Sequence, residues 1–175
     1  MMNLLVISDS HGRSENVEAA IKRQLALPQK FRATHLLHLG DGVSDVDKCA
    51  LASRLCVCAV RGNCDSFFYA DSLVYERVIE LGGARILMMH GHTRGVKGGD
   101  GSAVLCAAAM GADILLYGHT PTPISYTLEK GSEINGVVLS KRLSVFNPGS
   151  IGYDASFGMI TIDGDNIICS HGCLK

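Results

Sequence analysis

Residues 4–12 constrain the fold of this chain more than any other segment. They read LLVISDSHG, so a short run of leucine and β-branched residues stops abruptly at a carboxylate, a hydroxyl and an imidazole. Such a run predicts a strand buried on both faces, which delivers its last residues to the sheet edge where open α/β folds bind ligands. Asp9 and His11 are two residues apart, so they lie on one side of the strand end and can reach a common point. This pairing indicates a metal site, although a strand followed by a polar turn would give the same short pattern.

The pattern recurs four more times along the chain. Apolar runs end in Gly-Asp, Gly-Asn, His-Gly-His and Gly-His-Thr within residues 35–41, 55–65, 85–92 and 112–120. Each run stops at a side chain that can bind a metal or form hydrogen bonds, and chance is a poor explanation for such a series. The side chains at these strand ends are therefore candidates for one site.

Hydrophobic spacing predicts alternating strands and helices at the start of the chain and consecutive strands at its end. We expect helices at 14–27, 44–52 and 101–110, with Ser14 as the N-cap of the first. We expect strands at 4–7, 34–39, 55–60, 74–80, 85–90, 114–117, 124–128, 137–146, 157–162 and 166–170. Alternation of this kind is typical of a parallel sheet with right-handed crossovers. With the later meander it predicts an α/β fold of two sheets packed face to face with helices outside, and residues 1–175 form one domain.

Composition limits the classes of protein to which the chain can belong. At 175 residues, 47% of them hydrophobic, it can bury one core of good size, and its formal net charge of −1 provides no basic stripe for nucleic acid or an anionic membrane. No apolar run approaches the roughly 20 residues of a membrane span, and a first strand that begins by Leu4 leaves no room for a signal peptide, so we expect a cytoplasmic protein. The seven cysteines form no CxxC pair, which favours buried reduced thiols.

Six side chains at the strand ends are candidate metal ligands: Asp9, His11, Asp41, Asn63, His90 and His119. Carboxylate, imidazole and amide donors without thiolates suit Mn²⁺, Fe²⁺ or Zn²⁺. One ion takes about four to six donors, and a carboxylate can bridge, so two ions about 3.5–4 Å apart that share one aspartate would account for the whole set. Such a pair generates hydroxide at neutral pH and stabilises both oxygens of an in-line displacement at phosphorus.

The ordered series Asp9-Ser10-His11, Gly40-Asp41, Gly62-Asn63, His90-Gly91-His92 and Gly118-His119 resembles the calcineurin-like metallophosphoesterases. Within that family the chain is similar to the small YfcE-like phosphodiesterase branch, whose members also show the Gly-Asn-Cys-Asp and Asn-Pro-Gly-Ser segments found here at 62–65 and 147–150. The resemblance covers nearly the whole chain. Each motif is weak alone, but the series in this order and spacing is highly specific.

The resemblance implies a four-layer α-β-β-α sandwich of two mixed sheets flanked by helices, with two divalent metal ions at its site. In the family pattern, Asp9 and His11 bind the first ion, Asp41 bridges, and Asn63, His90 and His119 bind the second. The implied activity is hydrolysis of phosphodiesters by a hydroxide held by the two metals, with Asp9, Asp41, Asn63 and His90 as catalytic residues. Mn²⁺ commonly supports activity in this branch, and Fe²⁺, Zn²⁺, Ni²⁺ and Mg²⁺ are the alternatives.

Two positions depart from the family pattern. The last motif is usually Gly-His-x-His, but its final position here is Pro121, which offers no side-chain donor. We therefore expect the first ion to bind weakly and to exchange readily. Many larger phosphatases of the family carry a histidine after Gly-Asn that protonates the leaving group, whereas this chain has Cys64. Because a neutral thiol is a poor general acid, activity should favour substrates with good leaving groups.

Further polar residues have both a functional and an ordinary interpretation. Arg94 and Lys97 are candidate substrate ligands that would neutralise a phosphate oxygen, or exposed loop cations. His38 would orient a metal ligand from behind, or simply pack within its strand.

Three acidic residues are assigned no role at the metals. Asp45 and Asp47 are expected on a solvated helix face, and Asp65 is expected to cap the segment that follows it.

Two other functions stay open at this stage. The metals alone do not choose the ester, so a phosphomonoesterase or a pyrophosphate-cleaving enzyme is one alternative. A retromer subunit shares the fold of the family and acts mainly as a scaffold, so a non-catalytic interaction protein is the other, and Pro121 gives it weight. The expected partner is a small phosphodiester or phosphoester. We expect no membrane partner, and no nucleic-acid surface is evident. Edge strands in the C-terminal meander could also support a homo-oligomer.

Overall fold

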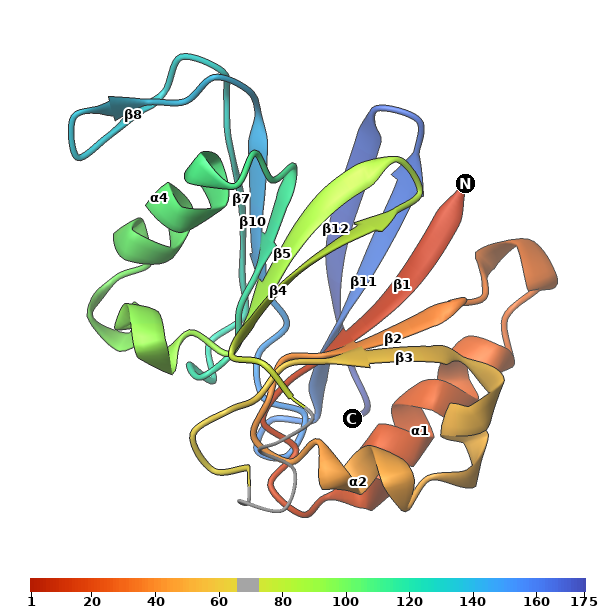
Figure 1. The fold of residues 1–175 in the computed structure, drawn as a ribbon. Helices are drawn as coiled ribbons and strands as arrows, with labels where there is room; N and C mark the ends of the chain where they lie inside the picture. Colours follow the sequence, from red (N-terminus) through yellow and green to blue (C-terminus); the bar gives the residue numbers. More distant parts are fainter. Residues whose placement is uncertain (66–72) are drawn as a thin grey trace.

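The computed structural model describes residues 1–65 and 73–175, which form two five-stranded sheets that face each other (Figure 1). The first sheet contains, in chain order, β1 (Met2–Ile7), β2 (His35–His38), β3 (Cys56–Ala59), β11 (Ser156–Asp163) and β12 (Asn166–Cys173). The second contains β4 (Glu76–Leu81), β5 (Ala84–Met89), β6 (Ile114–Leu116), β7 (Ile124–Leu128) and β10 (Leu143–Asn147). A separate small hairpin consists of β8 (Glu133–Ile134) and β9 (Val137–Val138).

The helices lie outside the two sheets (Figure 1). They are α1 (Ser14–Leu25), α2 (Ser44–Asp47) and α4 (Gly101–Ala109), with short 3₁₀ helices at Gln29–Phe31, Ala50–Arg54, His92–Arg94 and Val96–Gly98. None of the helices in the described ranges has the length and apolar character needed to span a bilayer.

Both sheets are mixed, as the sequence predicts. β1 pairs in parallel with β2 and antiparallel with β11, and β5, β6 and β10 are parallel neighbours between the antiparallel strands β4 and β7. The order β12-β11-β1-β2-β3 places β1 in the centre of the first sheet. This position explains the uniformly apolar run at residues 4–7, because all four side chains are fully buried.

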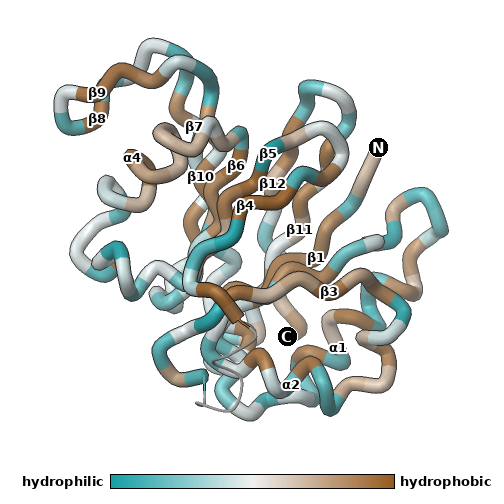
Figure 2. The backbone as a smooth tube through the Cα atoms, viewed as in Figure 1, coloured by the Kyte–Doolittle hydropathy of each residue, from teal (hydrophilic) through white to brown (hydrophobic). Residues whose placement is uncertain are grey.

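Three apolar clusters separate four layers, which confirms the α-β-β-α sandwich. Alternate residues of β1 enter different clusters: Leu4 and Val6 pack between the two sheets, whereas Leu5 and Ile7 pack against α1. A third cluster lies between β5, β6 and β10 of the second sheet and the alanine-rich face of α4. In Figure 2, hydrophobic residues run along strands such as β1 and β3, and hydrophilic residues occupy many of the connections.

Some predicted elements differ in detail from the structure. The helix expected at 44–52 breaks after α2, because Cys49 adopts an extended conformation before the next 3₁₀ turn. The prediction that Ser14 caps α1 is wrong: Ser14 is the first residue of the helix, and Arg13 occupies the cap position without a side-chain hydrogen bond.

The strand expected at 137–146 is two strands. Asn135 and Gly136 both have positive φ, of 49° and 80°, and they turn β9 back onto β8 instead of letting it continue into β10. Positive φ at both central residues is the property that makes Asn-Gly a hairpin turn. The later strand β10 then joins the second sheet between β6 and β7.

We predict that Phe146→Ala lowers the free energy of unfolding by about 3–5 kcal/mol, the usual cost of emptying a large buried site. Phe146 is fully buried between the sheets, and its ring stacks on His171 with the ring centroids 4.5 Å apart. Urea denaturation of this variant and of the matched control Phe31→Ala checks the prediction. Phe31 is 46% exposed, so its truncation should cost much less. Equal losses in the two variants would contradict the core assignment.

Candidate metal centre

The candidate ligands lie where strands of both sheets end. Asp9 and His11 follow β1, Asp41 follows β2, Asn63 follows β3, His90 follows β5 and His119 follows β6. Backbone hydrogen bonds draw these ends together, since the N–H of Asp9 donates to Gly40 and that of Gly118 donates to His90. The His119 N–H crosses between the sheets and donates to Asp9 Oδ2 at 3.1 Å.

Backbone strain is concentrated at this place. The described residues include six non-glycine residues with positive φ, and four of them are candidate ligands: Asp9 (54°), His11 (45°), Asp41 (59°) and His119 (66°). Residues other than glycine rarely adopt this left-handed backbone conformation, which persists only where the surrounding structure enforces it. The strained loops turn these side chains back toward the junction of the two sheets.

Two glycines explain why the motifs pair Gly with Asp and Gly with Asn. Gly40 has a φ of 95°, and a Cβ on it would lie 2.6 Å from the Gly62 nitrogen. A Cβ on Gly62 would overlap Asp41, so neither position has room for a side chain. The close approach of these two backbones sets the position of the Asp41 carboxylate.

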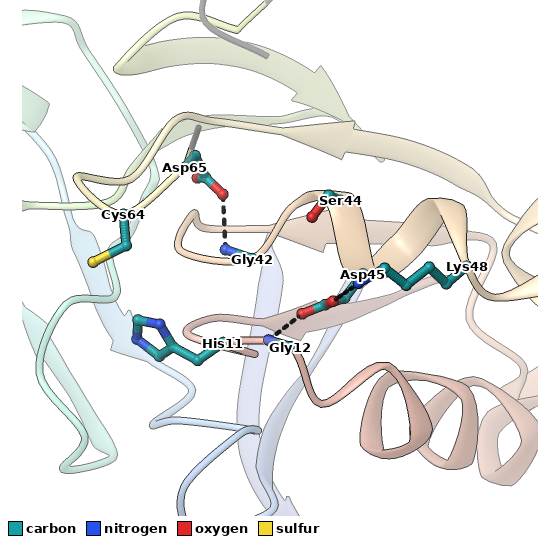
Figure 3. A pocket seen from close by; sticks show the side chains of 8 residues that line it. All are labelled: His11, Gly12, Gly42, Ser44, Asp45, Lys48, Cys64 and Asp65. Atoms are coloured by element: carbon teal, nitrogen blue, oxygen red, sulfur yellow. Dashed lines mark hydrogen bonds and ion pairs between the residues drawn. The ribbon is translucent and has the colours of Figure 1, made fainter. Parts of the chain in front are cut away.

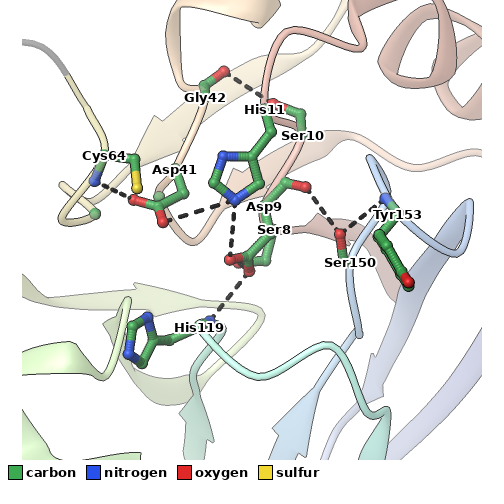
Figure 4. Close-up of polar contacts among 12 residues, drawn as sticks. Ser8, Asp9, Ser10, His11, Asp41, Gly42, Cys64, His119, Ser150 and Tyr153 are labelled. Carbon is green, nitrogen blue, oxygen red and sulfur yellow. Dashed lines mark hydrogen bonds and ion pairs between the residues drawn. The ribbon is translucent and has the colours of Figure 1, made fainter.

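The ligand atoms form two overlapping groups. The first donor set is Asp9, His11 and Asp41, and the second donor set is Asp41, Asn63, His90 and His119. In the first, His11 Nε2 lies 3.8 Å from both Asp9 Oδ1 and Asp41 Oδ2 (Figure 4). In the second, His90 Nε2 lies 3.3 Å from Asp41 Oδ2, 3.2 Å from Asn63 Oδ1 and 3.1 Å from His119 Nδ1. The structure thus brings all six candidates together, with Asp41 in both groups.

The second donor set is chemically suited to a cation. His90 Nδ1 lies 2.8 Å from the Leu39 carbonyl oxygen, which can only accept, so Nδ1 carries a proton and Nε2 presents its lone pair. That lone pair faces the oxygens of Asp41 and Asn63, which are also acceptors. Such crowding of acceptors is relieved by a proton or a metal ion at their centre, and an N–H to carbonyl bond of this kind commonly orients a metal-binding histidine.

The pKa shifts of these residues agree with a cation at their centre. Burial opposes a positive charge on His90, but the carboxylates of Asp41 and Asp9 outweigh burial and raise its pKa. Burial similarly opposes ionisation of Asp41, but when no ion is bound, hydrogen bonds from a proton at His90 Nε2 and from Cys64 hold the pKa of Asp41 well below the usual range. Burial and the neighbouring charge of His90 lower the pKa of His119 to about 4, so this imidazole is neutral and free to bind a metal at pH 7.

Asp65 holds two of the loops together from behind. Its carboxylate accepts hydrogen bonds from the backbone N–H groups of Asp41, Gly42, Val43 and Gly62 at 2.7–3.0 Å. The segment that Asp65 is predicted to cap lies outside the described residues. The role visible in the structure is to join the Asp41 loop to the Gly62 loop.

The prediction that Asp45 lies on a solvated helix face is wrong. Its side chain is 1% exposed, and it accepts hydrogen bonds from Ser10 Oγ at 2.8 Å and from the Gly12 N–H at 2.7 Å. Lys48 Nζ lies 2.8 Å from its other oxygen. Asp45 lies on the one-turn helix α2 and reaches the loop that carries Asp9 and His11. Asp47, on the same helix, is exposed as expected.

Residues 147–151 brace the same loop from the opposite side. Ser150 Oγ donates to the Asp9 carbonyl at 2.9 Å and accepts the Tyr153 N–H at 3.0 Å (Figure 4). The Ile151 N–H donates to the Ser8 carbonyl. This contact gives the Asn-Pro-Gly-Ser segment a structural role at the site. Tyr153 itself, 82% exposed at the rim, is a residue to which no sequence signal points.

His38 contacts the loops of the site from their buried side. It is fully buried, its Nδ1 accepts the Gly40 N–H at 3.1 Å, and its Nε2 lies 3.4 Å from Ser10 Oγ. Burial lowers the pKa of His38 to about 4, so the ring is neutral when it accepts this hydrogen bond. His38 therefore touches both of the loops that carry the first donor set.

The two candidate substrate cations differ in their surroundings. Arg94 forms a two-pronged ion pair with Glu76, with nitrogen to oxygen distances of 2.7 and 2.9 Å. Lys97 is exposed, and its charge helps to lower the pKa of His119 after burial and His90. Lys97 is thus the more available of the two to a ligand at the centre.

Two of the hollows that His11 lines matter for the donor sets. One, of about 310 Å³, is polar and is lined among others by Cys64, Asp45 and Lys48 (Figure 3). The other, of about 240 Å³, is lined by the first-set residues Asp9 and His11 together with Pro121 and Tyr153. Pro121 is exposed beside the first donor set and adds no donor to it.

We predict that Asp45→Asn lowers the free energy of unfolding at pH 7 by about 1–3 kcal/mol, because the Ser10 and Gly12 donors lose a charged acceptor. Burial raises the Asp45 pKa, but Lys48, Ser10 and Gly12 together lower it overall. A lowered pKa stabilises the fold above the ordinary value of about 3.9, and this stability is lost as the pH falls through the lowered pKa. Urea denaturation should therefore show a gap between wild type and variant that narrows below about pH 4.

Asp165→Asn is the control, since it makes the same change at an exposed position of the turn between β11 and β12. The role of Asp45 would be contradicted if wild type and Asp45→Asn differed by the same free energy of unfolding at pH 7 and in acid. An equal loss of stability in the control would contradict it as well.

Comparison with protein families gives one model match. The model of the calcineurin-like phosphoesterase superfamily domain matches residues 2–166. Among curated proteins, the phosphodiesterase YfcE of Escherichia coli K12 is 31% identical over an alignment 188 positions long. The alignment covers 93% of this chain and 89% of that protein.

Solved structures share the fold. A predicted phosphoesterase from Streptococcus pneumoniae superposes with a TM-score of 0.72 at 24% identity, over 99% of this chain and 90% of that one. A Vps29 variant from Entamoeba histolytica superposes with a TM-score of 0.66 at 23% identity, over 98% of each chain. Likeness at this level of identity concerns the fold, and the function must be argued from the site.

Proposed function

We propose that this chain, which belongs to the calcineurin-like phosphoesterase superfamily, is a metal-dependent phosphodiesterase. The observation that carries the proposal is the place of Asp41. Its carboxylate belongs to both donor sets, 3.8 Å from His11 Nε2 and 3.3 Å from His90 Nε2. A carboxylate between two donor sets is suited to bridge two divalent ions.

The cofactors that we propose are two divalent ions, with Mn²⁺ as the first to test and Fe²⁺, Zn²⁺, Ni²⁺ or Mg²⁺ as alternatives. Asp9, His11 and Asp41 would hold the first ion, and Asp41, Asn63, His90 and His119 the second. When bound, such ions make water nucleophilic near pH 7 and stabilise the attacking and leaving oxygens of an in-line displacement.

The chain's own residues would orient the ester and leave the site open to it. The side chain of His11 is 49% exposed, so a small phosphodiester can reach the first donor set from solvent. Lys97 is available to neutralise a phosphate oxygen, and Arg94 would do so only by sharing its guanidinium with Glu76. Asp9, Asp41, Asn63 and His90 are the residues whose loss should affect turnover most.

The leaving group receives little help from the protein. Without an ion, burial and nearby carboxylates raise the pKa of Cys64, so its thiol gives up a proton less readily than an imidazole would at neutral pH. Diesters with good leaving groups, such as nitrophenyl esters, should therefore be the better substrates.

A scaffold role is the second candidate, since the fold is shared with Vps29 and Pro121 supplies no ligand. A phosphomonoesterase on the same metals is the third, and turnover of matched monoester, diester and anhydride substrates separates it from the first. A protein that takes up metal yet hydrolyses none of these esters would favour the scaffold.

We predict that the metal-free protein hydrolyses bis(p-nitrophenyl) phosphate only after addition of Mn²⁺, and that Asp41→Asn abolishes most of this activity. The loss should exceed the roughly 10- to 100-fold that removal of an outer-shell partner costs, because the shared ligand itself is changed. Release of nitrophenolate measures the rate. The matched control Asp165→Asn, at an exposed turn far along the chain, should keep full activity. Equal rates in Asp41→Asn and wild type would contradict the proposal.

We further predict that Pro121→His lowers the Mn²⁺ concentration needed for half-maximal activity, by about tenfold or more, because it adds an imidazole beside the first donor set. Activity measured across a Mn²⁺ titration gives this value for the two proteins. An unchanged Mn²⁺ requirement would mean that the first donor set does not lack a ligand at this position.

A further inference from the structure

The first donor set is short of protein ligands. Asp9, His11 and Asp41 supply three donors, and the exposed Pro121 adds none. An ion held by three protein donors is completed by water or by a fourth side chain. A fourth side chain would have to lie close to both His11 and Asp41.

Cys64 lies in that position. Its Sγ, a ring nitrogen of His11 and a carboxylate oxygen of Asp41 all lie within 4.8 Å of one another. Cys64 is exposed, and Figure 3 shows its sulfur and the His11 ring on the same side of the polar hollow. His11, Asp41 and Cys64 thus form a group of metal-capable atoms that differs from the second donor set.

Neighbouring contacts fix Cys64 in this place. Its backbone N–H donates to Asp41 Oδ1 at 2.6 Å (Figure 4). The Asn63 side-chain amide donates to its sulfur at 3.2 Å. This hydrogen bond uses one lone pair of the sulfur and leaves another for a cation. The backbone of Cys64 is thereby tied to the bridging carboxylate, so that its side chain needs to turn about only one bond to approach a shared ion.

We propose that Cys64 is a thiolate ligand of the first ion and supplies a fourth protein donor, which Pro121 does not. The inference rests on the proposed two-ion centre. In the ligation step a bond forms between sulfur and the cation, the S–H bond breaks, and the proton leaves to solvent, with no change in oxidation state.

The two donor sets then differ in their preference for metals. A thiolate favours softer ions such as Zn²⁺ or Co²⁺, whereas the nitrogen and oxygen donors of the second set also suit Mn²⁺. Cys64 therefore selects the metal at the first position. It also explains how this chain can lack the final histidine of the last motif and still hold two ions.

Titration of the metal-free protein with Co²⁺ tests the proposal through absorption spectra. Visible d–d bands report that Co²⁺ is bound, and a sulfur-to-cobalt charge-transfer band in the near ultraviolet reports a thiolate ligand. Wild type should show both. Cys64→Ser should keep the visible bands and lose the near-ultraviolet band, and it should bind Zn²⁺ at least about tenfold more weakly at the first position.

Cys56→Ser is the matched control, because Cys56 is also exposed but lies on β3. It should keep both sets of bands. Visible bands without the charge-transfer band in wild type, or a charge-transfer band that survives in Cys64→Ser, would overturn the assignment of Cys64 and leave the proposed phosphodiesterase intact. Absence of every cobalt band in wild type would overturn the two-ion centre and the thiolate ligand together.

Discussion

The site depends on a conflict among hydrogen-bond acceptors at the junction of two sheets. The Nδ1–H of His90 donates a hydrogen bond to the Leu39 carbonyl, so in the neutral ring the lone pair at Nε2 faces oxygens of Asp41 and Asn63. Such a cluster is costly unless a cation lies within it. The surrounding backbone enforces the cluster through left-handed conformations at Asp9, Asp41 and other loop residues. The fold thus stores strain where a positive ion would relieve repulsion.

Much of this could be predicted from the sequence, because the strongest signals are local. A buried strand that ends in Asp-x-His is visible as a run of letters, and the resemblance to a known family supplied the four-layer architecture. The roles of Asp45 and Asp65 could not be predicted in this way. Their partners are backbone N–H groups on loops that are distant in the sequence, and a backbone donor has no signature in the residue that carries it. The Asn135-Gly136 turn was visible as a dipeptide, but the β-rich residues after it favoured one long strand.

The same fold occurs in proteins with phosphoesterase names and in Vps29, so the architecture does not decide between chemistry and scaffolding. Side chains that serve no packing purpose favour a chemical role over a scaffold role. His11 is half exposed, and His119 is held neutral beside Asp41. Pro121 adds no donor to the first donor set, and Cys64 lies close to His11 and Asp41 of that set.

Anomalous diffraction from crystals grown with Mn²⁺ tests whether Asp41 bridges two ions. We expect two anomalous peaks about 3.5–4 Å apart, with one oxygen of Asp41 between them. The peak nearer His11 should be the weaker at limiting Mn²⁺. A single peak, or two peaks that do not share Asp41, would contradict the account.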